Sequence, residues 1–388
     1  MTTAIEQPNA ATDEADGQSL ATGGVGPALL AIEQALNGAG TWATAHRLVT
    51  QATSSPVDAG RHAGLYYGAP AILFTLNAAA SDGHERYAAA RRHLTLHVRR
   101  LIRERLTDAD IRMRHGQAAA FAEYDLFHGL TGLGALLLRD LPDSDELTDL
   151  LTYVTRLTEP QTDDEHRLPG WWVNHDPDPT LPTPGGHANL GMAHGAAGLL
   201  ALLALALRKG RHVDRQAEAT ERLCSWFERW QQDSRHGPWW PQWLTRDDLR
   251  TGRPAQAGPG RPSWCYGTPG IARALQLAAI ATNQPTRQAA AETALAASLS
   301  CTQLDQLTDP GICHGLAGLH ATAYRAAQDA LTSDIAAQLP ALAERLQRVP
   351  SPDHAGFLTG HPGCSLASET ARKNTPPRTR WDTCLLIT

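Results

Sequence analysis

The chain has 388 residues, of which 42% are hydrophobic and 19% charged, with a formal net charge of -6 at pH 7. This composition supplies a large apolar core and lacks the concentrated positive charge of a nucleic-acid-binding protein, so we expect no nucleic acid as partner. The six cysteines are scattered and no secretory signal precedes them, which predicts a reduced, cytoplasmic protein. The longest apolar run, residues 196–207, is shorter than the about 20 residues of a membrane-spanning helix, so we expect no transmembrane segment.

The first 25 residues are small, polar and acidic, and they predict a disordered tail before a single domain at residues 26–388. The rest of the chain is rich in Ala, Leu, Arg and Glu, with few alternating or β-branched runs. This pattern predicts an all-α protein. The clearest amphipathic helices are expected at residues 87–106, 146–157, 215–231, 286–300 and 334–349.

A repeated motif divides the chain into helix pairs of roughly 45–70 residues. Each copy has a glycine, a second small residue three positions on, and then an apolar run. Helix pairs stacked around an axis close into an α/α barrel, or toroid, and we expect six to seven pairs. The leading glycines are Gly68, Gly129, Gly195, Gly267, Gly315 and Gly360.

Two of the gaps between motifs are long and rich in proline and tryptophan, at residues 160–187 and 236–263. Long loops in compact domains are commonly functional, which favours a substrate-binding rim. The alternative is a pair of surface insertions packed by their own tryptophans.

Reactive side chains recur in the few residues just before the motif glycines. Cys265 and Cys313 stand two residues before a motif glycine, His314 and His194 one residue before, and Asp125 four residues before. Equivalent positions of a barrel lie at the same height, so we expect these side chains to converge at one mouth.

Cys265, Cys313 and His314 form a Cys₂His set, and three protein ligands with an open fourth position are typical of catalytic zinc. The alternative is that both cysteines are buried core thiols, and their shared phase favours the metal. The other cysteines lack this phase, and we expect them to pack in the core: Cys224, Cys301, Cys364 and Cys384.

Five segments in order resemble the signature motifs of the lanthionine synthetase C-like cyclases. They are residues 124–132, 189–198, 264–270 and 313–318, and residues 356–360 followed by Trp381 and Asp382. The resemblance covers about residues 60–388 and implies an α/α toroid with one zinc ion at its mouth. It also implies a carbon–sulfur bond-forming enzyme of the lyase class, which adds cysteine thiols of a precursor peptide to dehydroalanine or dehydrobutyrine. The products are lanthionine and methyllanthionine thioether rings, as in antibiotic biosynthesis.

The resemblance assigns a role to each mouth residue. Cys265, Cys313 and His314 would bind zinc, and His194 would protonate the enolate formed after thiol attack. Asp125 would assist acid–base chemistry or orient a partner. Tyr266 would hydrogen-bond to reacting groups and Arg261 would stabilise the enolate. The remaining histidines carry weaker signals: His128 shares the phase of His194, whereas His175, His187 and His361 are expected in loops or at the surface.

The expected partners are a dehydrated precursor peptide and a separate dehydratase, because the chain shows no dehydratase region and is interpreted as a stand-alone cyclase. The expected location is the cytoplasm, with a place in a membrane-associated biosynthetic complex also allowed. Two alternatives remain. One is a zinc enzyme of this fold that adds a small thiol such as glutathione to an electrophilic peptide, and the other is a non-catalytic peptide-binding scaffold.

Overall fold

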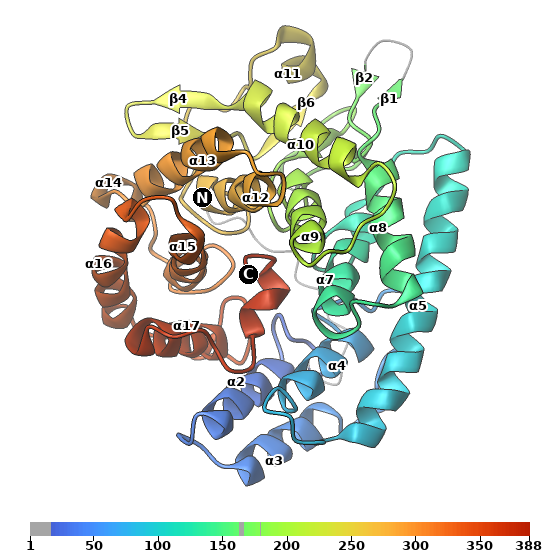
Figure 1. Ribbon diagram of the computed structural model, residues 1–388, viewed down its shortest axis with the longest axis vertical. Helices are drawn as coiled ribbons and strands as arrows, with labels where there is room; N and C mark the ends of the chain where they lie inside the picture. Colours follow the sequence, from blue (N-terminus) through green and yellow to red (C-terminus); the bar gives the residue numbers. More distant parts are fainter. Residues whose placement is uncertain (1–16, 163–166, 179) are drawn as a thin grey trace.

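The structure, a computed structural model, describes residues 17–162, 167–178 and 180–388. Within these residues seven inner helices form a closed ring, because each contacts the next and the last contacts the first (Figure 1). This arrangement confirms the predicted all-α toroid. The inner helices are α2 (Val25–Leu36), α4 (Ala69–Ala78), α7 (Leu130–Asp140), α9 (Ala196–Arg208), α12 (Thr268–Ala281), α15 (Leu316–Asp329) and α17 (His361–Lys373).

An outer layer of amphipathic helices packs on the inner ring. Inner helices such as α9 are buried on all sides over most of their length, whereas outer helices bury one stripe and expose the other. The five predicted amphipathic helices are all present, and α5 continues to Arg114 instead of ending at residue 106. The outer helices are α3 (Trp42–Ala52), α5 (Ala88–Arg114), α8 (Asp145–Leu157), α10 (Gln216–Trp230), α13 (Pro285–Ser298) and α16 (Asp334–Arg348).

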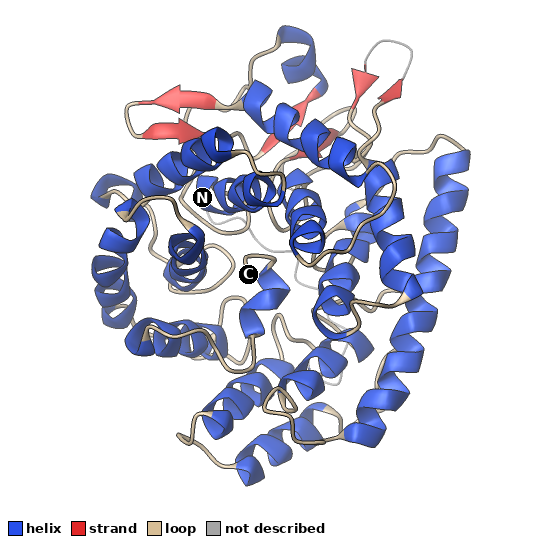
Figure 2. Cartoon of the chain, in the orientation of Figure 1, coloured by secondary structure: helices blue, strands red, loops and turns tan. Residues whose placement is uncertain are grey.

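The two long Pro/Trp-rich segments contain most of the small elements (Figure 2). Three two-stranded antiparallel sheets form in or beside these segments: β1 (Gln161–Thr162) with β2 (Arg167–Leu168), β3 (His187–Asn189) with β6 (Trp243–Thr245), and β4 (Gln232–Ser234) with β5 (Gly237–Trp239). Because β3 and β6 come from different segments, they join the two into one layer. The short helices are α6 (Phe121–Tyr124), α11 (Arg246–Thr251), α14 (Cys301–Leu304) and the 3₁₀ helix η1 (Trp381–Leu385).

The described part of the expected tail is packed into the fold. Leu20 is fully buried and its amide donates to the Tyr66 carbonyl at 2.9 Å. Residues 17–25, which were expected in the tail, therefore contact the helical domain through Leu20. Residues 1–16 lie outside the described residues. Among the described residues, none of the helices combines the length and apolar character that crossing a bilayer requires.

The loops that precede the inner helices, called the mouth loops here, are joined by main-chain hydrogen bonds. In each case an amide of one loop donates to a carbonyl of a neighbouring loop. This seam brings equivalent positions of distant repeats into direct contact. The bonds are Leu126 N to Ala193 O (3.0 Å), Ala193 N to Cys265 O (3.2 Å), Cys265 N to Cys313 O (3.2 Å), Cys313 N to Leu358 O (2.9 Å) and Leu358 N to Ala21 O (3.1 Å).

The second glycine of the motif lets each helix begin against its own mouth loop. A Cβ atom added at Gly318 would lie 1.8 Å from the Ile312 carbonyl oxygen, and one at Gly270 would lie 2.0 Å from that of Trp264. No side chain fits at such distances, so the glycine is required by close backbone approach.

The C-terminal residues fill the centre of the ring, where the chain end lies in Figure 1. Residues 384–387 are buried, and three of their carbonyls accept hydrogen bonds from buried side chains. Cys384 O accepts from the Tyr66 hydroxyl (2.9 Å), Leu385 O from Trp264 Nε1 (3.0 Å) and Ile387 O from Arg273 Nε (3.0 Å). The chain end is thus bonded to residues of two mouth loops, Tyr66 and Trp264.

We expect Gly318→Ala to destabilise the protein strongly, by about 3 kcal/mol or more, because the new methyl group overlaps a backbone carbonyl. Gly258→Ala is the matched control, since no atom of the residues that the structure describes lies within 4 Å of its added Cβ. Urea denaturation followed by circular dichroism measures both. Equal midpoints for the two variants would contradict the close-approach explanation.

Candidate metal centre

The predicted metal ligands Cys265, Cys313 and His314 meet at the mouth. Their ligand atoms all lie within 4.8 Å of one another, and the group comes from the mouth loops before α12 and α15. Both cysteines are buried, and the His314 side chain is 13% exposed. The seam bond from Cys265 N to Cys313 O holds the two loops together beside the sulfurs.

The surroundings of the cluster stabilise a thiolate at Cys265, next to a protonated thiol and an imidazolium. Burial acts to raise the pKa of the Cys265 thiol, but hydrogen bonds with Cys313 and His314 outweigh it and place that pKa well below its usual value. The hydrogen bond to Cys265 and burial raise the pKa of Cys313, the opposite direction to that of Cys265. Burial acts against the His314 cation, yet Asp309 and Cys265 raise the pKa of His314 to about 9. A buried site that gathers protons around sulfur is one that a metal cation can occupy by displacing them.

This donor set fits zinc. Two thiolates and one imidazole are soft to borderline ligands that select Zn²⁺ over Mg²⁺ or Ca²⁺. Three protein ligands leave a fourth tetrahedral position for another group. Arg261, on the loop before Cys265, lies close enough for its charge to act on Asp309, Cys313 and His314.

Asp309 orients the His314 ring and was not predicted from the sequence. Its Oδ2 lies 3.1 Å from His314 Nε2, and its Oδ1 accepts the Gly311 amide at 2.6 Å. Because Nε2 is engaged, Nδ1 is the nitrogen left for a metal. In the sequence, the run Asp309-Pro310-Gly311 is typical of a turn. That pattern explains the bond to Gly311 but does not indicate that the same carboxylate also contacts His314.

A second imidazole–carboxylate pair lies at the same mouth. His194 Nδ1 lies 2.6 Å from Asp125 Oδ2, and Asp125 Oδ1 accepts the amides of His128 and Gly129 at 2.6 and 2.8 Å. Burial would raise the pKa of Asp125, but the hydrogen bonds from His128 and His194 hold it well below its ordinary value. Asp125 is therefore ionised and fixes the His194 ring, leaving Nε2 as the other nitrogen. The His128 side chain is 59% exposed and lies 3.5 Å from the same carboxylate.

Aromatic rings surround His194 and connect it to the cluster. The Tyr266 ring centroid is 5.9 Å from that of His194. Burial and the charges of Cys265, Cys313 and Asp125 raise the pKa of Tyr266 well above its usual value, so it stays a neutral phenol. Phe121 stacks on His194 at 5.0 Å and Phe127 meets it edge-on at 4.9 Å. No pattern in the sequence indicated a role for these phenylalanines, because apolar residues are common throughout the chain.

One further histidine departs from expectation. His187 is fully buried, so its predicted place in a loop or at the surface is wrong. It lies in β3, its Nδ1 is 3.0 Å from the His175 carbonyl, and burial lowers its pKa to about 4. His175 and His361 are exposed, as predicted.

The cysteines outside the cluster divide into two kinds. Cys224, Cys364 and Cys384 are buried as predicted, and burial raises the pKa of each to about 12. Cys301 is exposed at the start of α14, so its predicted core role is wrong.

Comparison with known proteins agrees with this architecture. The family described as "Lanthionine synthetase C-like protein" matches residues 14–385. The nisin biosynthesis protein NisC of Lactococcus lactis subsp. lactis is 24% identical over 212 residues, so the match spans 53% of this chain and about half, 49%, of that protein. A solved structure of nisin cyclase superposes with a TM-score of 0.81 at 20% identity and covers 97% of this chain and 93% of that one. At this identity the structural likeness shows the fold.

We expect Asp309→Asn to weaken zinc binding by about 10- to 100-fold, because His314 loses the partner that orients it. Competition with a chromogenic chelator measures the zinc dissociation constant. Asp305→Asn is the control, since Asp305 is an exposed partner of Arg345. Unchanged zinc affinity in Asp309→Asn would show that this carboxylate has no part in the site.

The chain end offers a second test of how the cluster is positioned. Trp264 precedes Cys265 and donates to Leu385 O, so Trp264→Phe frees that loop and should weaken zinc binding about tenfold. Trp381→Phe is the matched control, because Trp381 is also buried but its Nε1 has no hydrogen-bond partner among the described residues. The same chelator competition compares them. Equal zinc affinities would show that the bond to Leu385 does not support the cluster.

Proposed function

Because the chain belongs to the lanthionine synthetase C-like family, we propose that it is a zinc-dependent lanthipeptide cyclase. It adds cysteine thiols of a precursor peptide to dehydroalanine or dehydrobutyrine and closes thioether rings. The observation that carries the proposal is the pairing, at one mouth, of a buried Cys₂His cluster with a carboxylate-held histidine.

The cluster is suited to activate the nucleophile, the peptide thiol. Cys265, Cys313 and His314 would hold a zinc ion, and a bound zinc would supply the Lewis acidity that lowers the pKa of a thiol. Asp309 keeps His314 in the tautomer that presents Nδ1 to the ion. Both sulfurs are almost fully buried, which limits their contact with solvent.

The addition needs one proton delivered to carbon. The sulfur–Cβ bond forms as the π bond of the dehydro residue breaks, the thiol loses its proton, and Cα gains one, so the peptide mass does not change. His194 is suited to donate that proton from Nε2, because Asp125 holds its Nδ1 and stabilises the imidazolium. A positioned general acid contributes about 10²–10⁴-fold.

Charge on the substrate carbonyl develops before that proton arrives. Tyr266 remains a neutral phenol beside His194 and can donate a hydrogen bond to the enolate oxygen. Arg261 supplies a fixed positive charge beside the cluster. The substrate on this proposal is a peptide dehydrated by a separate dehydratase, which must act first.

The experiment incubates the protein with a peptide that contains dehydroalanine and cysteine, alkylates remaining thiols and weighs the product. Cyclisation protects the peptide cysteine from alkylation at unchanged peptide mass. We expect Cys313→Ala to lose both zinc and protection, because the ion loses a ligand. His194→Ala should retain zinc and lose protection by at least about 100-fold in rate.

Cys301→Ser is the control, since this exposed thiol lies outside the cluster and should leave zinc and cyclisation unchanged. Normal cyclisation by Cys313→Ala would refute the mechanism. Added glutathione that appears as a mass gain on the peptide, without ring closure, would instead support a small-thiol transferase.

A further inference from the structure

A buried side-chain amide borders the loop of the acid–base histidine. Asn189 is fully buried at the end of β3, where it is the antiparallel partner of Trp243 in β6. Its main-chain oxygen and its Oδ1 pack against Gly195, because a Cβ atom added to that glycine would lie 2.4 and 2.6 Å from them. Gly195 directly follows His194 in the chain. The two-stranded sheet of β3 and β6 therefore holds Asn189 beside the acid–base pair.

One hydrogen bond fixes the orientation of this amide. Asn189 Oδ1 accepts the Gly191 main-chain amide at 2.8 Å. Because a main-chain N–H can only donate, the atom that faces it must be the oxygen, and Nδ2 is directed elsewhere. Nδ2 is buried and makes no hydrogen bond of ordinary length and angle among the described residues. Asn189 thus presents a donor that the protein itself leaves unused.

The phenol of Tyr266 lies within reach of that donor. The two side chains meet over Gly191, since a Cβ atom added there would lie 2.9 Å from Tyr266 Cδ1 and 3.2 Å from Asn189 Oδ1. Burial raises the pKa of Tyr266, whereas the Asn189 amide acts on it as a hydrogen-bond donor and lowers it. A group has that effect when it donates to the phenol oxygen, because it stabilises the phenolate.

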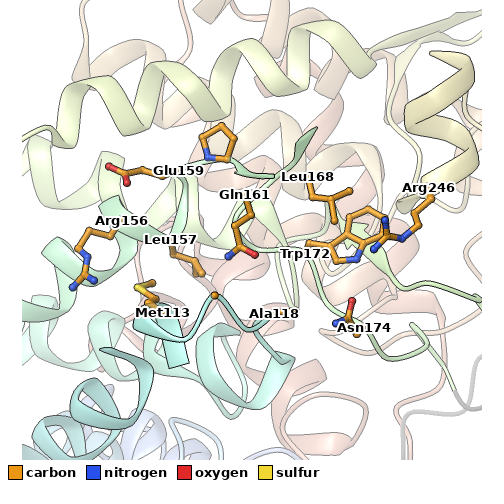
Figure 3. Close-up of a pocket in the computed structure, with 12 residues that line it drawn as sticks. Met113, Ala118, Arg156, Leu157, Glu159, Gln161, Leu168, Trp172, Asn174 and Arg246 are labelled. Atoms are coloured by element: carbon orange, nitrogen blue, oxygen red, sulfur yellow. The ribbon is translucent and has the colours of Figure 1, made fainter. Parts of the chain in front are cut away.

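The pocket beside the first long Pro/Trp-rich segment does not account for the unused donor. This pocket has a volume of about 450 Å³, and Trp172, Asn174 and Arg246 are among the residues that line it (Figure 3). Neither Asn189 nor Tyr266 is one of its lining residues. A ligand in this pocket would not meet the amide, which leaves the phenol as the group that the amide serves.

A phenol can accept one hydrogen bond while it donates another. When a donor engages the phenol oxygen, the phenol O–H becomes a stronger donor, because hydrogen bonds in a chain polarise one another. Tyr266 is only partly buried, so its proton can reach a group in the mouth. Thiol addition to a dehydro residue places negative charge on a carbonyl oxygen, and a fixed donor stabilises that charge.

We propose that Asn189 is a positioning residue for Tyr266, and that its Nδ2 donates to the phenol oxygen and directs the phenol proton toward the enolate oxygen of the substrate. Asn189 acts in this role only through Tyr266. The role rests on the proposed function for its effect on rate, but the contact itself can be measured without any reaction.

The kinetic test is a double-mutant cycle on the cyclisation of the dehydrated cysteine-containing peptide. Asn189→Asp keeps the oxygen that accepts from Gly191 and removes the donor, so we expect kcat to fall about tenfold with KM and zinc content unchanged. In a Tyr266→Phe background the same substitution should change kcat by less than about twofold, because the phenol is already absent. Asn189→Ser repeats the cycle without adding a charge and replaces the aspartate variant if that one does not fold.

Gln303→Glu is the matched control, because Gln303 is also buried and its Nε2 is likewise unpaired among the described residues, but it lies on α14. This variant should leave kcat unchanged. A fall of kcat by the same factor in the Tyr266 and Tyr266→Phe backgrounds, or no fall in either, would overturn the positioning role.

The contact is tested without substrate by fluorine NMR of protein labelled with 3-fluorotyrosine. The Tyr266→Phe variant identifies the Tyr266 resonance by its loss. Asn189→Asp and Asn189→Ser should both shift this resonance, and Gln303→Glu should leave it in place. An unshifted resonance in both Asn189 variants would refute the contact. A shifted resonance in a protein that never cyclises the peptide would keep the contact and count against the proposed activity alone.

Discussion

Main-chain hydrogen bonds between neighbouring mouth loops hold this end of the toroid together, and those among Ala193, Cys265, Cys313 and Leu358 join positions of equal phase in successive repeats. The bond from Cys265 N to Cys313 O is one of this series, so the metal cluster is a local consequence of a general seam. The glycines that follow each loop allow the seam to form, because a side chain there would push loop and helix apart. The site is therefore as rigid as the ring itself, as a preorganised metal centre requires.

The mouth contains two imidazole–carboxylate pairs. A carboxylate fixes an imidazole in both cases, but it engages opposite nitrogens: Asp309 contacts Nε2 of His314, whereas Asp125 contacts Nδ1 of His194. In His314 this leaves Nδ1 for the sulfur cluster, and in His194 it leaves Nε2 as the nitrogen that can carry a second proton. Tyr266 lies beside both and stays neutral. The Cys₂His cluster and the His194–Asp125 pair are thus two distinct groups at one mouth, each with its own carboxylate partner.

Two regions outside the mouth loops add to this arrangement: the C-terminal residues and the Pro/Trp-rich segments. The C-terminal residues fill the ring and bond to Tyr66 and Trp264, which ties the chain end to the loop of Cys265. The Pro/Trp-rich segments are joined by β3 and β6. The cluster is thus supported from the centre of the ring by the chain end.

The sequence by itself determined the repeat, the toroid, and the side chains that share a phase, because periodic glycines and reactive residues are local signals. It therefore predicted the residues that meet at the cluster, Cys265, Cys313 and His314, and the pair of His194 and Asp125. Features that depend on contacts between loops were decided only by the tertiary structure. Asp309 became a partner of His314, His187 became buried, Cys301 became exposed, and residues 17–25 joined the ring. These outcomes come from contacts between segments far apart in the chain, and no local pattern of residue types encodes them.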